Sequence, residues 1–104
     1  MTQSFQDLQH RVLTLAKNFP HQWDKKTHFV DLVEEVGELA NALLIEGKDK
    51  DQKRKRAEIN DSLADILFEL IQLADACDVD LLEVLSKQLD ELEIRQNNRE
   101  YHDD

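Results

Sequence analysis

The chain has 104 residues, of which 40% are hydrophobic and 35% are charged, and its formal net charge is -10 at pH 7. A chain of this length suits one domain with a modest core, so further burial by self-association is expected. The negative field opposes non-specific binding to nucleic acid or to an anionic membrane surface. A phosphate-bearing ligand must therefore arrive with cations or reach a local basic spot.

Cysteine content and hydropathy favour a cytoplasmic location. The single cysteine, Cys77, cannot form an internal disulfide, and its leucine and alanine neighbours predict that it lies in the core. The N-terminal residues lack the basic and apolar regions of a signal peptide. No apolar run approaches the ~20 residues that span a bilayer. The sequence therefore predicts a cytoplasmic protein that does not bind membranes.

Two glycines and one proline leave little to interrupt long helices. Apolar residues at helical spacing predict a first helix over 4–18, which Pro20 ends. A second helix is predicted from Thr27, as its N-cap, to Gly47, as the residue after its end. Its predicted core face consists of Phe29, Leu32, Val33, Val36, Leu39, Ala40 and Leu43. Gly37 lies inside this helix at a cost of about 1 kcal/mol relative to alanine, which suggests close approach by another helix or a ligand.

A basic segment precedes the third predicted helix. Residues 48–56 form either a loop or the exposed start of this helix, which runs to about Ala76. The four consecutive cations at 53–56 have two interpretations. They steer or cover an anionic substrate, or they form a solubilising surface.

The fourth predicted helix begins after Asp78 or Asp80, either of which is a good N-cap, and ends near Gln96. The polar residues 97–104 are expected to fray. Four amphipathic helices without β alternation predict a single all-α domain over residues 1–104, with the architecture of a four-helix bundle.

Two acidic stripes lie on the middle helices. The second helix carries Asp31, Glu34, Glu35 and Glu38 within an arc of about 100°, and the third carries Glu58, Asp61, Asp65 and Glu69 within about 80°. Like charges four residues apart repel each other, and few basic residues offset this repulsion. One interpretation is a solvated face, because each stripe lies roughly opposite the apolar face of its helix. The other is a site for Mg²⁺, which prefers carboxylate oxygens that two facing helices can supply.

The acidic segment 34–39, EEVGEL, resembles the EExxE motif of the MazG-type nucleotide pyrophosphohydrolases. This all-α superfamily includes the dCTP pyrophosphatases and the dimeric dUTPases. The segment 63–68, LADILF, is similar to the one that carries the aspartate of the family's ExxD motif, and the resemblance extends over about 27–90. The glutamate expected three residues before Asp65 is replaced by Ser62.

That replacement leaves two candidates for the missing carboxylate, Asp61 and Glu58. A literal ExxD occurs one turn earlier, at 58–61, but the residues that flank Asp65 match the family better. The resemblance implies a MazG-type fold that resembles a four-helix bundle and is completed by oligomerisation, as a homodimer or homotetramer. It also implies Mg²⁺-dependent hydrolysis of (d)NTP to (d)NMP and pyrophosphate, in nucleotide-pool house-cleaning, with Mn²⁺ as a substitute metal.

The resemblance also implies roles for individual residues. The catalytic residues would be Glu34, Glu35 and Glu38, and the metal ligands would be Glu35, Glu38 and Asp65 together with Asp61 or Glu58. Within this set, Glu34 is the candidate to orient or deprotonate water. The substrate-binding candidates are Lys87 and Arg95, for phosphate, and Trp23, which precedes the second helix where related proteins place aromatic residues against the base. A solvated lysine is the alternative for Lys87.

Two other functions stay open at this point. A catalytically degenerate helical interaction module of the same fold would explain Ser62. Binding of nucleic acid through residues 53–56 is opposed by the net charge of -10. A zinc site is not expected, because the four histidines lack metal-ligand spacing.

Overall fold

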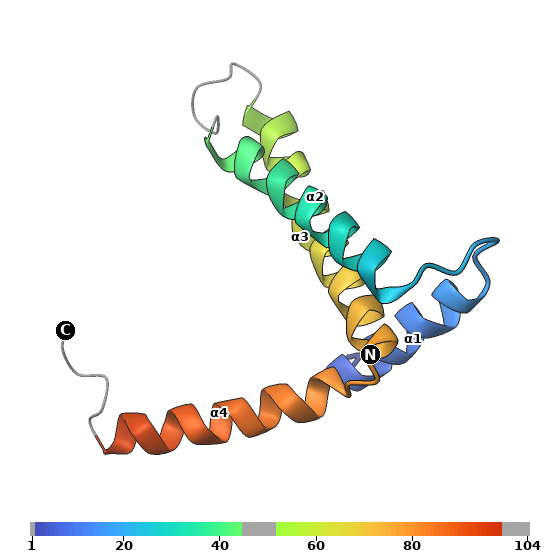
Figure 1. Cartoon of the computed structure of the whole chain (residues 1–104). Coiled ribbons are helices and arrows are strands. Elements are labelled where there is room, and N and C mark those ends of the chain that lie inside the picture. Colours follow the sequence, from blue (N-terminus) through green and yellow to red (C-terminus); the bar gives the residue numbers. More distant parts are fainter. Residues whose placement is uncertain (1, 45–51, 99–104) are drawn as a thin grey trace.

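The computed structural model describes residues 2–44 and 52–98, and all regular secondary structure in this part of the chain is helical. The helices are α1 (Phe5–Lys17), α2 (Lys25–Leu44), α3 (Gln52–Ala76) and α4 (Leu81–Asn97). The predicted all-α class is therefore confirmed. Figure 1 shows α2 and α3 as an antiparallel pair, with α1 beside the C-terminal half of α3 and α4 extending away from the other three. None of the described helices is long and apolar enough to cross a membrane.

Side-chain caps fix the starts of α1 and α4. Ser4 Oγ accepts a hydrogen bond from the Asp7 N–H at 3.0 Å, and Asp7 Oδ2 accepts one from the Ser4 N–H at 3.2 Å, which completes a capping box. Asp80 Oδ1 accepts from the Glu83 N–H at 3.2 Å. Asp80 rather than Asp78 is therefore the N-cap of α4, and the predicted extents of both helices are confirmed to within a residue or two.

The predicted N-cap of α2 is wrong. This helix begins at Lys25, and the Thr27 N–H donates to Asp24 Oδ1 at 2.8 Å, so Asp24 is the residue that caps its free amides. The same hydrogen bond holds the pKa of Asp24 below its usual value. The predicted end at Gly47 lies outside the described residues.

Residues 53–56 of the basic segment form the start of a helix and not a loop. Because α3 begins at Gln52, residues 53–56 belong to its first turns, and residues 48–51 lie outside the described part of the chain. The prediction of a frayed tail concerns mainly residues 99–104, which also lie outside it.

The predicted core face of α2 does not form a core in one chain. Phe29 is 57% exposed and Val33 53% exposed, and Val36 and Leu43 are also exposed. The reason is that α2 turns a different stripe toward α3, one that contains the buried or half-buried His28, Asp31, Leu32, Glu35, Leu39 and Ala42. Among the residues that the structure describes, few hydrophobic ones are buried, namely Ala42, Ile59, Ile71 and Ala74. Within residues 2–44 and 52–98, the single chain therefore leaves many large apolar side chains exposed.

Two smaller expectations also change. A Cβ atom added to Gly37 would meet nothing within 4 Å, so no part of this chain described here approaches that glycine closely. Cys77 is exposed rather than buried, because it directly follows the last residue of α3, in the turn that leads to α4.

Candidate active site

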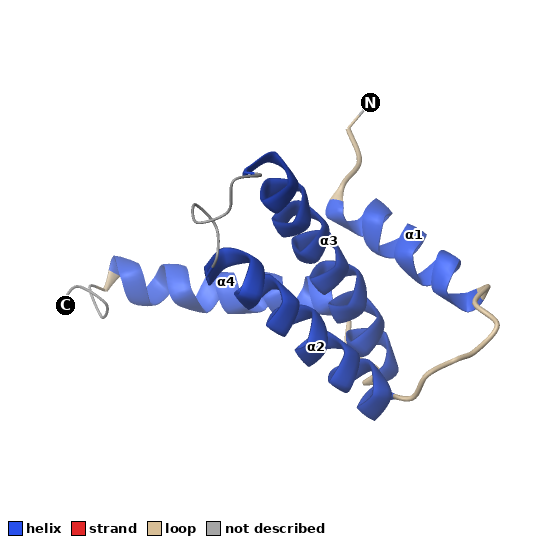
Figure 2. Ribbon diagram, turned by 90° about the horizontal axis from the view of Figure 1, so that it is seen from above, coloured by secondary structure: helices blue, strands red, loops and turns tan. Residues whose placement is uncertain are grey.

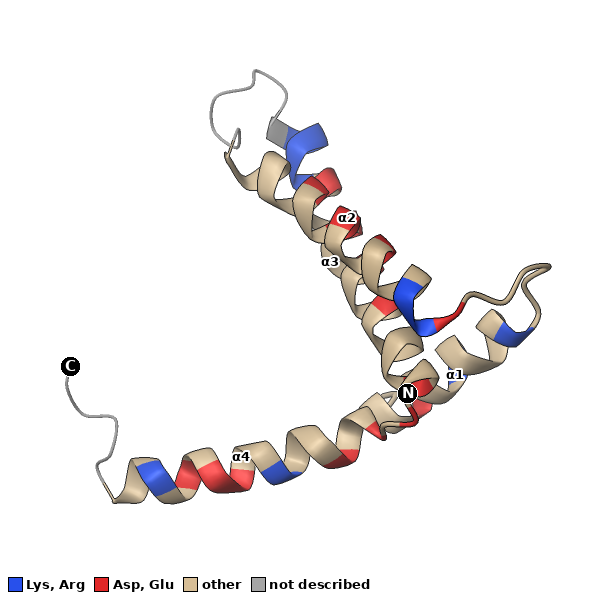
Figure 3. Ribbon diagram, in the orientation of Figure 1, with Lys and Arg blue, Asp and Glu red and all other residues tan. Residues whose placement is uncertain are grey.

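The two acidic stripes meet in a groove between α2 and α3. The groove has a volume of about 390 Å³ and is lined by Glu35, Glu38, Asn41 and Ala42 from α2 and by Glu58, Asp61, Ser62 and Asp65 from α3. We call it the acidic groove. It brings together every residue that the sequence analysis named as a metal ligand. Figure 3 shows that these acidic positions lie along the helix pair, with basic residues at the start of α3.

The crowding of negative charge is strongest at Glu35. Burial raises the pKa of this carboxyl above its usual value, and the charges of Glu38, Asp65 and Asp31 raise it further. Part of this electrostatic cost would be removed by a cation in the groove. The protonation of Glu35 and the binding of a cation there are therefore in competition.

The donor set of the groove fits Mg²⁺ in its chemistry, because it consists of carboxylate, amide and hydroxyl oxygens. Among residues 2–44 and 52–98, no three aspartate, glutamate, histidine or cysteine side chains converge as a ready-made metal site. This is compatible with Mg²⁺, which usually keeps several waters and binds through one or two carboxylates together with substrate phosphates.

The two candidates to replace the missing carboxylate differ in their surroundings. Glu58 accepts hydrogen bonds from Arg54 Nη1 at 3.1 Å and from Lys55 Nζ at 3.2 Å. Lys55 is buried, which neither interpretation of the basic run foresaw. Asp61 lines the groove one turn further along α3, beside Ser62. Because Arg54 and Lys55 already bind the Glu58 carboxylate, Asp61 is the better placed of the two candidates to bind a cation.

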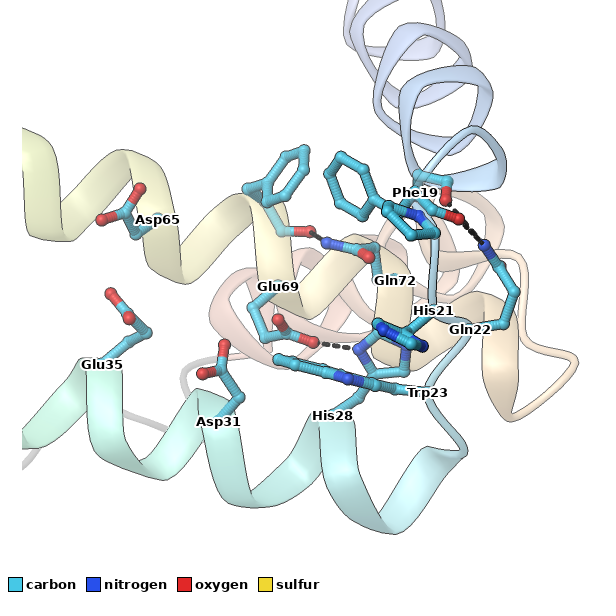
Figure 4. Close-up of a pocket in the computed structure, with 13 residues that line it drawn as sticks. Phe19, His21, Gln22, Trp23, His28, Asp31, Glu35, Asp65, Glu69 and Gln72 are labelled. Atoms are coloured by element: carbon cyan, nitrogen blue, oxygen red, sulfur yellow. Dashed lines mark hydrogen bonds and ion pairs between the residues drawn. The ribbon is translucent and has the colours of Figure 1, made fainter.

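A second cavity, the aromatic pocket, adjoins the acidic groove. It has a volume of about 450 Å³, and its walls come from the end of α1, the α1–α2 connection, α2 and α3. The rings of Phe19 and Phe68 lie 6.3 Å apart at 55°, and those of Trp23 and His28 lie 5.5 Å apart at 59°. Glu35 and Asp65 line both cavities, so the pocket and the groove adjoin each other at these two residues. Figure 4 shows the two carboxylates facing each other at one end of the pocket.

A buried polar pair crosses from α2 to α3 in the aromatic pocket. His28 is 8% exposed and Glu69 is 4% exposed, and a hydrogen bond joins His28 Nδ1 and Glu69 Oε1. Burial raises the pKa of Glu69 to about 8, with further contributions from a side-chain hydrogen bond to Asp31 and from the charges of Asp31 and Glu35. The raised pKa means that Glu69 is mostly protonated at neutral pH.

This pair was not predicted from the sequence. Glu69 was placed in the acidic stripe without a role, and His28 was considered only as a zinc ligand. The available signal was spacing, because His28, Asp31 and Glu35 stand three and four residues apart and so share one face of a helix.

Of the other residues predicted to be functional, one lines a cavity and three do not. Trp23 lines the aromatic pocket. Glu34 is exposed on α2 and lines neither cavity. Lys87 and Arg95 lie on α4, which extends away from the site (Figure 1), and also line neither cavity. One chain therefore does not bring its own α4 residues to the groove.

The chain matches the model of the MazG nucleotide pyrophosphohydrolase domain over residues 24–100. The match covers most of the chain, and the chain therefore belongs to the MazG nucleotide pyrophosphohydrolase family. The matched segment contains every residue that lines the acidic groove, whereas α1, Phe19 and Trp23 precede it. No curated protein matched the chain.

Proposed function

We propose that this protein is a Mg²⁺-dependent pyrophosphohydrolase that converts (d)NTP and water to (d)NMP and pyrophosphate, clearing unwanted nucleotides from the pool. One structural observation supports this reaction in addition to family membership. Glu35 and Asp65 line both the aromatic pocket and the acidic groove.

Because the two cavities meet at Glu35 and Asp65, a nucleotide bound across them has a definite orientation. Aromatic side chains stack on nucleobases, so the base belongs in the pocket lined by Phe19, Trp23 and Phe68. The polyphosphate, with its cations, belongs in the acidic groove. The α-phosphorus joins these two parts of the nucleotide, so it belongs at the junction, beside Glu35 and Asp65. An enzyme that cleaves between the α- and β-phosphates needs its reacting groups at this point.

Glu38, Asp65 and Asp61 are the residues that would hold Mg²⁺, and Mn²⁺, which accepts the same oxygen donors, would substitute. When bound, Mg²⁺ would supply positive charge that offsets the triphosphate and stabilises the charge that develops during phosphoryl transfer. Asp61 would supply the carboxylate of the family glutamate that Ser62 replaces, because the carboxylate of Glu58 is already bound by Arg54 and Lys55.

Glu35 is the proposed general base. It lies at the junction, and its raised pKa makes its carboxylate a better proton acceptor than an ordinary glutamate near neutral pH. It would orient a water molecule and accept its proton as the water oxygen bonds to the α-phosphorus. The bond from the α-phosphorus to the bridging oxygen breaks, and pyrophosphate leaves. Glu34, which points to solvent, has no direct role in this scheme.

The proposed active form is a homodimer or homotetramer. Support comes from large apolar side chains left exposed on three helices, namely Phe29, Val33, Val36, Leu63, Leu67, Val84, Leu85 and Leu89. Apolar surface of this kind marks a protein interface. Substrate contacts by Lys87 and Arg95 require that α4 of a second copy reach the groove.

The proposal is tested by measuring pyrophosphate release from a panel of ribo- and deoxyribonucleoside triphosphates, with Mg²⁺ and with EDTA. Turnover is expected only with Mg²⁺, and Glu38→Ala and Asp65→Ala should each reduce it on the order of 100-fold. Glu93→Gln, which removes an exposed charge on α4 away from the face of Lys87 and Arg95, is the matched control and should retain activity. Equal turnover in the wild type and in both groove variants would refute the assigned site.

Ser62 supports a second candidate, a catalytically degenerate helical interaction module of the same fold. This module would bind a protein partner through its exposed apolar faces and would release no pyrophosphate from any nucleotide in the panel. The same experiment therefore separates the two candidates.

A further inference from the structure

Lys55 is a buried cation that has no role in the reaction proposed above. Its side chain is 9% exposed, and its Nζ donates a hydrogen bond to Glu58 Oε2 at 3.2 Å. A lysine ammonium is almost never buried unless a partner compensates for the water it loses, so the Glu58 carboxylate is held against a fixed positive charge. Figure 3 shows the basic first turns of α3 next to the acidic positions of the helix pair.

Glu58 belongs to one of two overlapping acidic motifs on α3. Glu58 and Asp61 stand three residues apart. Ser62 and Asp65 have the same spacing, but Ser62 supplies no carboxylate. Residues three apart share a face of a helix, and all four residues line the acidic groove. Spacing alone therefore leaves two places along the groove, one helical turn apart, where a cation could bind.

The two places differ in the positive charge that is already present. Arg54 and Lys55 both donate to Glu58, whereas in the described part of the chain neither Asp61 nor Asp65 has a salt bridge to a lysine or arginine. The Arg54 side chain is 55% exposed, so solvent screens its charge and the side chain can turn away. The buried Lys55 can do neither. A cation at Glu58 would therefore meet a fixed like charge, whose repulsion is strongest where protein excludes water.

We propose that Lys55 is a positioning residue that keeps Glu58 from binding the metal ion and so directs Mg²⁺ to the turn of Asp61 and Asp65. This role rests on the proposed function, in that the acidic groove is taken as the metal site. Glu58 lies two helical turns from Asp65, roughly 10 Å along α3. A metal ion held by Glu58 would therefore lie away from the junction where the α-phosphorus belongs, and Lys55 prevents this displacement.

The role of Lys55 is tested by a double-mutant cycle on Mn²⁺ binding without nucleotide. Electron paramagnetic resonance of free Mn²⁺ gives the dissociation constant, at a salt concentration of about 0.15 M that screens exposed charges. In the wild type, Glu58→Gln should change this constant by less than about twofold, because Glu58 is not a ligand. In the background of Lys55→Met, which removes the charge but keeps a long side chain, Glu58→Gln should raise the constant at least about tenfold, because Glu58 has become a ligand.

Lys53→Met, which removes an exposed cation from the same turn of α3, is the matched control background and should leave the effect of Glu58→Gln small. A merely structural role of Lys55 would lower the stability of Lys55→Met but give Glu58→Gln the same effect in both backgrounds. That result would overturn the inference. A tenfold loss of Mn²⁺ affinity in Glu58→Gln alone would also overturn it, and this measurement does not require Lys55→Met to fold.

The outcomes separate this role from the proposed function. Mn²⁺ binding that follows the expected cycle, without pyrophosphate release from any nucleotide, would support the role of Lys55 and refute the hydrolase. Pyrophosphate release together with a loss of Mn²⁺ affinity in Glu58→Gln alone would refute the role of Lys55 and leave the hydrolase intact. No Mn²⁺ binding by the wild type would overturn the role of Lys55, because the groove would then not be a metal site.

Discussion

His28 on α2 and Glu69 on α3 are joined by a hydrogen bond in the interior of the helix pair, although 41 residues separate them in the sequence. Figure 2 shows α2 and α3, the two helices that carry these residues, running side by side. The pair lies under Trp23 and beside the junction of the two cavities, so it couples the packing of α2 on α3 to the shape of the proposed base pocket.

Removal of His28 should destabilise the fold. His28→Ala removes the hydrogen-bond partner of the buried Glu69 Oε1, and an unsatisfied buried polar group costs about 1–3 kcal/mol. The free energy of unfolding, measured by urea denaturation with circular dichroism, should fall by this amount. His10→Ala, which alters an exposed histidine on α1, is the control and should change it little. Equal losses in the two variants would show that the buried pair contributes nothing specific.

The raised pKa of Glu69 should make stability depend on pH. In the folded protein this carboxyl stays protonated up to about pH 8, whereas in the unfolded chain it ionises near 4.5. Its contribution to stability is therefore fully present below pH 4.5 and is lost as the pH rises through about 8. Unfolding of the wild type and of Glu69→Gln should be compared from pH 5 to 9. The wild type should lose stability relative to the variant over this range, and parallel curves would contradict the assignment.

The identity of the carboxylate that replaces the missing motif glutamate can be resolved with matched variants. Asp61→Asn should weaken Mg²⁺ binding, measured by isothermal titration calorimetry, more than Glu58→Gln does. The reason is that the Glu58 carboxylate is already paired with Arg54 and Lys55, whereas Asp61 lines the groove beside Ser62. The reverse order of the two effects would assign the ligand role to Glu58 instead.

Restoring the family motif should increase metal affinity. Ser62 lines the groove between the two acidic helices, so Ser62→Glu adds a carboxylate where the family carries one. More ligand charge in a divalent-cation site strengthens binding. Both Mg²⁺ affinity and the rate of pyrophosphate release should rise in this variant, with Ser62→Gln as the uncharged control. A rise in both variants, or in neither, would argue that charge at position 62 does not matter.

Gly37 offers a test of oligomerisation. In one chain, space is open around this residue, so Gly37→Ala in a monomer should stabilise α2 by about 1 kcal/mol. If a partner helix packs on the apolar face beside Gly37, the added methyl group should instead weaken the assembly. We expect the second result, which analytical ultracentrifugation would show as a larger dissociation constant of the oligomer. A monomer at all concentrations, stabilised by the alanine, would contradict the proposed oligomer.

Local signals predicted the helices well, because caps and breaks act over a few residues. Ser4 and Asp80 are good N-caps in any context, and both serve as such. The acidic groove was also foreseeable, since the stripes on α2 and α3 were each within one helical arc. The start of α2 was misjudged because Asp24 and Thr27 are both good N-caps, and sequence alone does not rank them.

The packing of α2 was not predictable from its own periodicity. The apolar face that contains Phe29 and Val33 indicates burial, but it does not tell which surface covers it. The contact between His28 and Glu69 depends on how two helices are paired and rotated against each other, and no short-range pattern encodes that rotation. The family resemblance predicted the fold more specifically than the apolar periodicity did.

The central claim is that the junction of the two cavities positions the α-phosphorus for attack by water. Phosphorus NMR of the reaction with a deoxyribonucleoside triphosphate and Mg²⁺ tests it most directly, since it identifies both products. Signals of the monophosphate and pyrophosphate should grow together at equal rates, and both should grow on the order of 100-fold more slowly in the Glu38→Ala reaction. Formation of a diphosphate and orthophosphate would place the attack at the γ-phosphorus and contradict the proposed orientation.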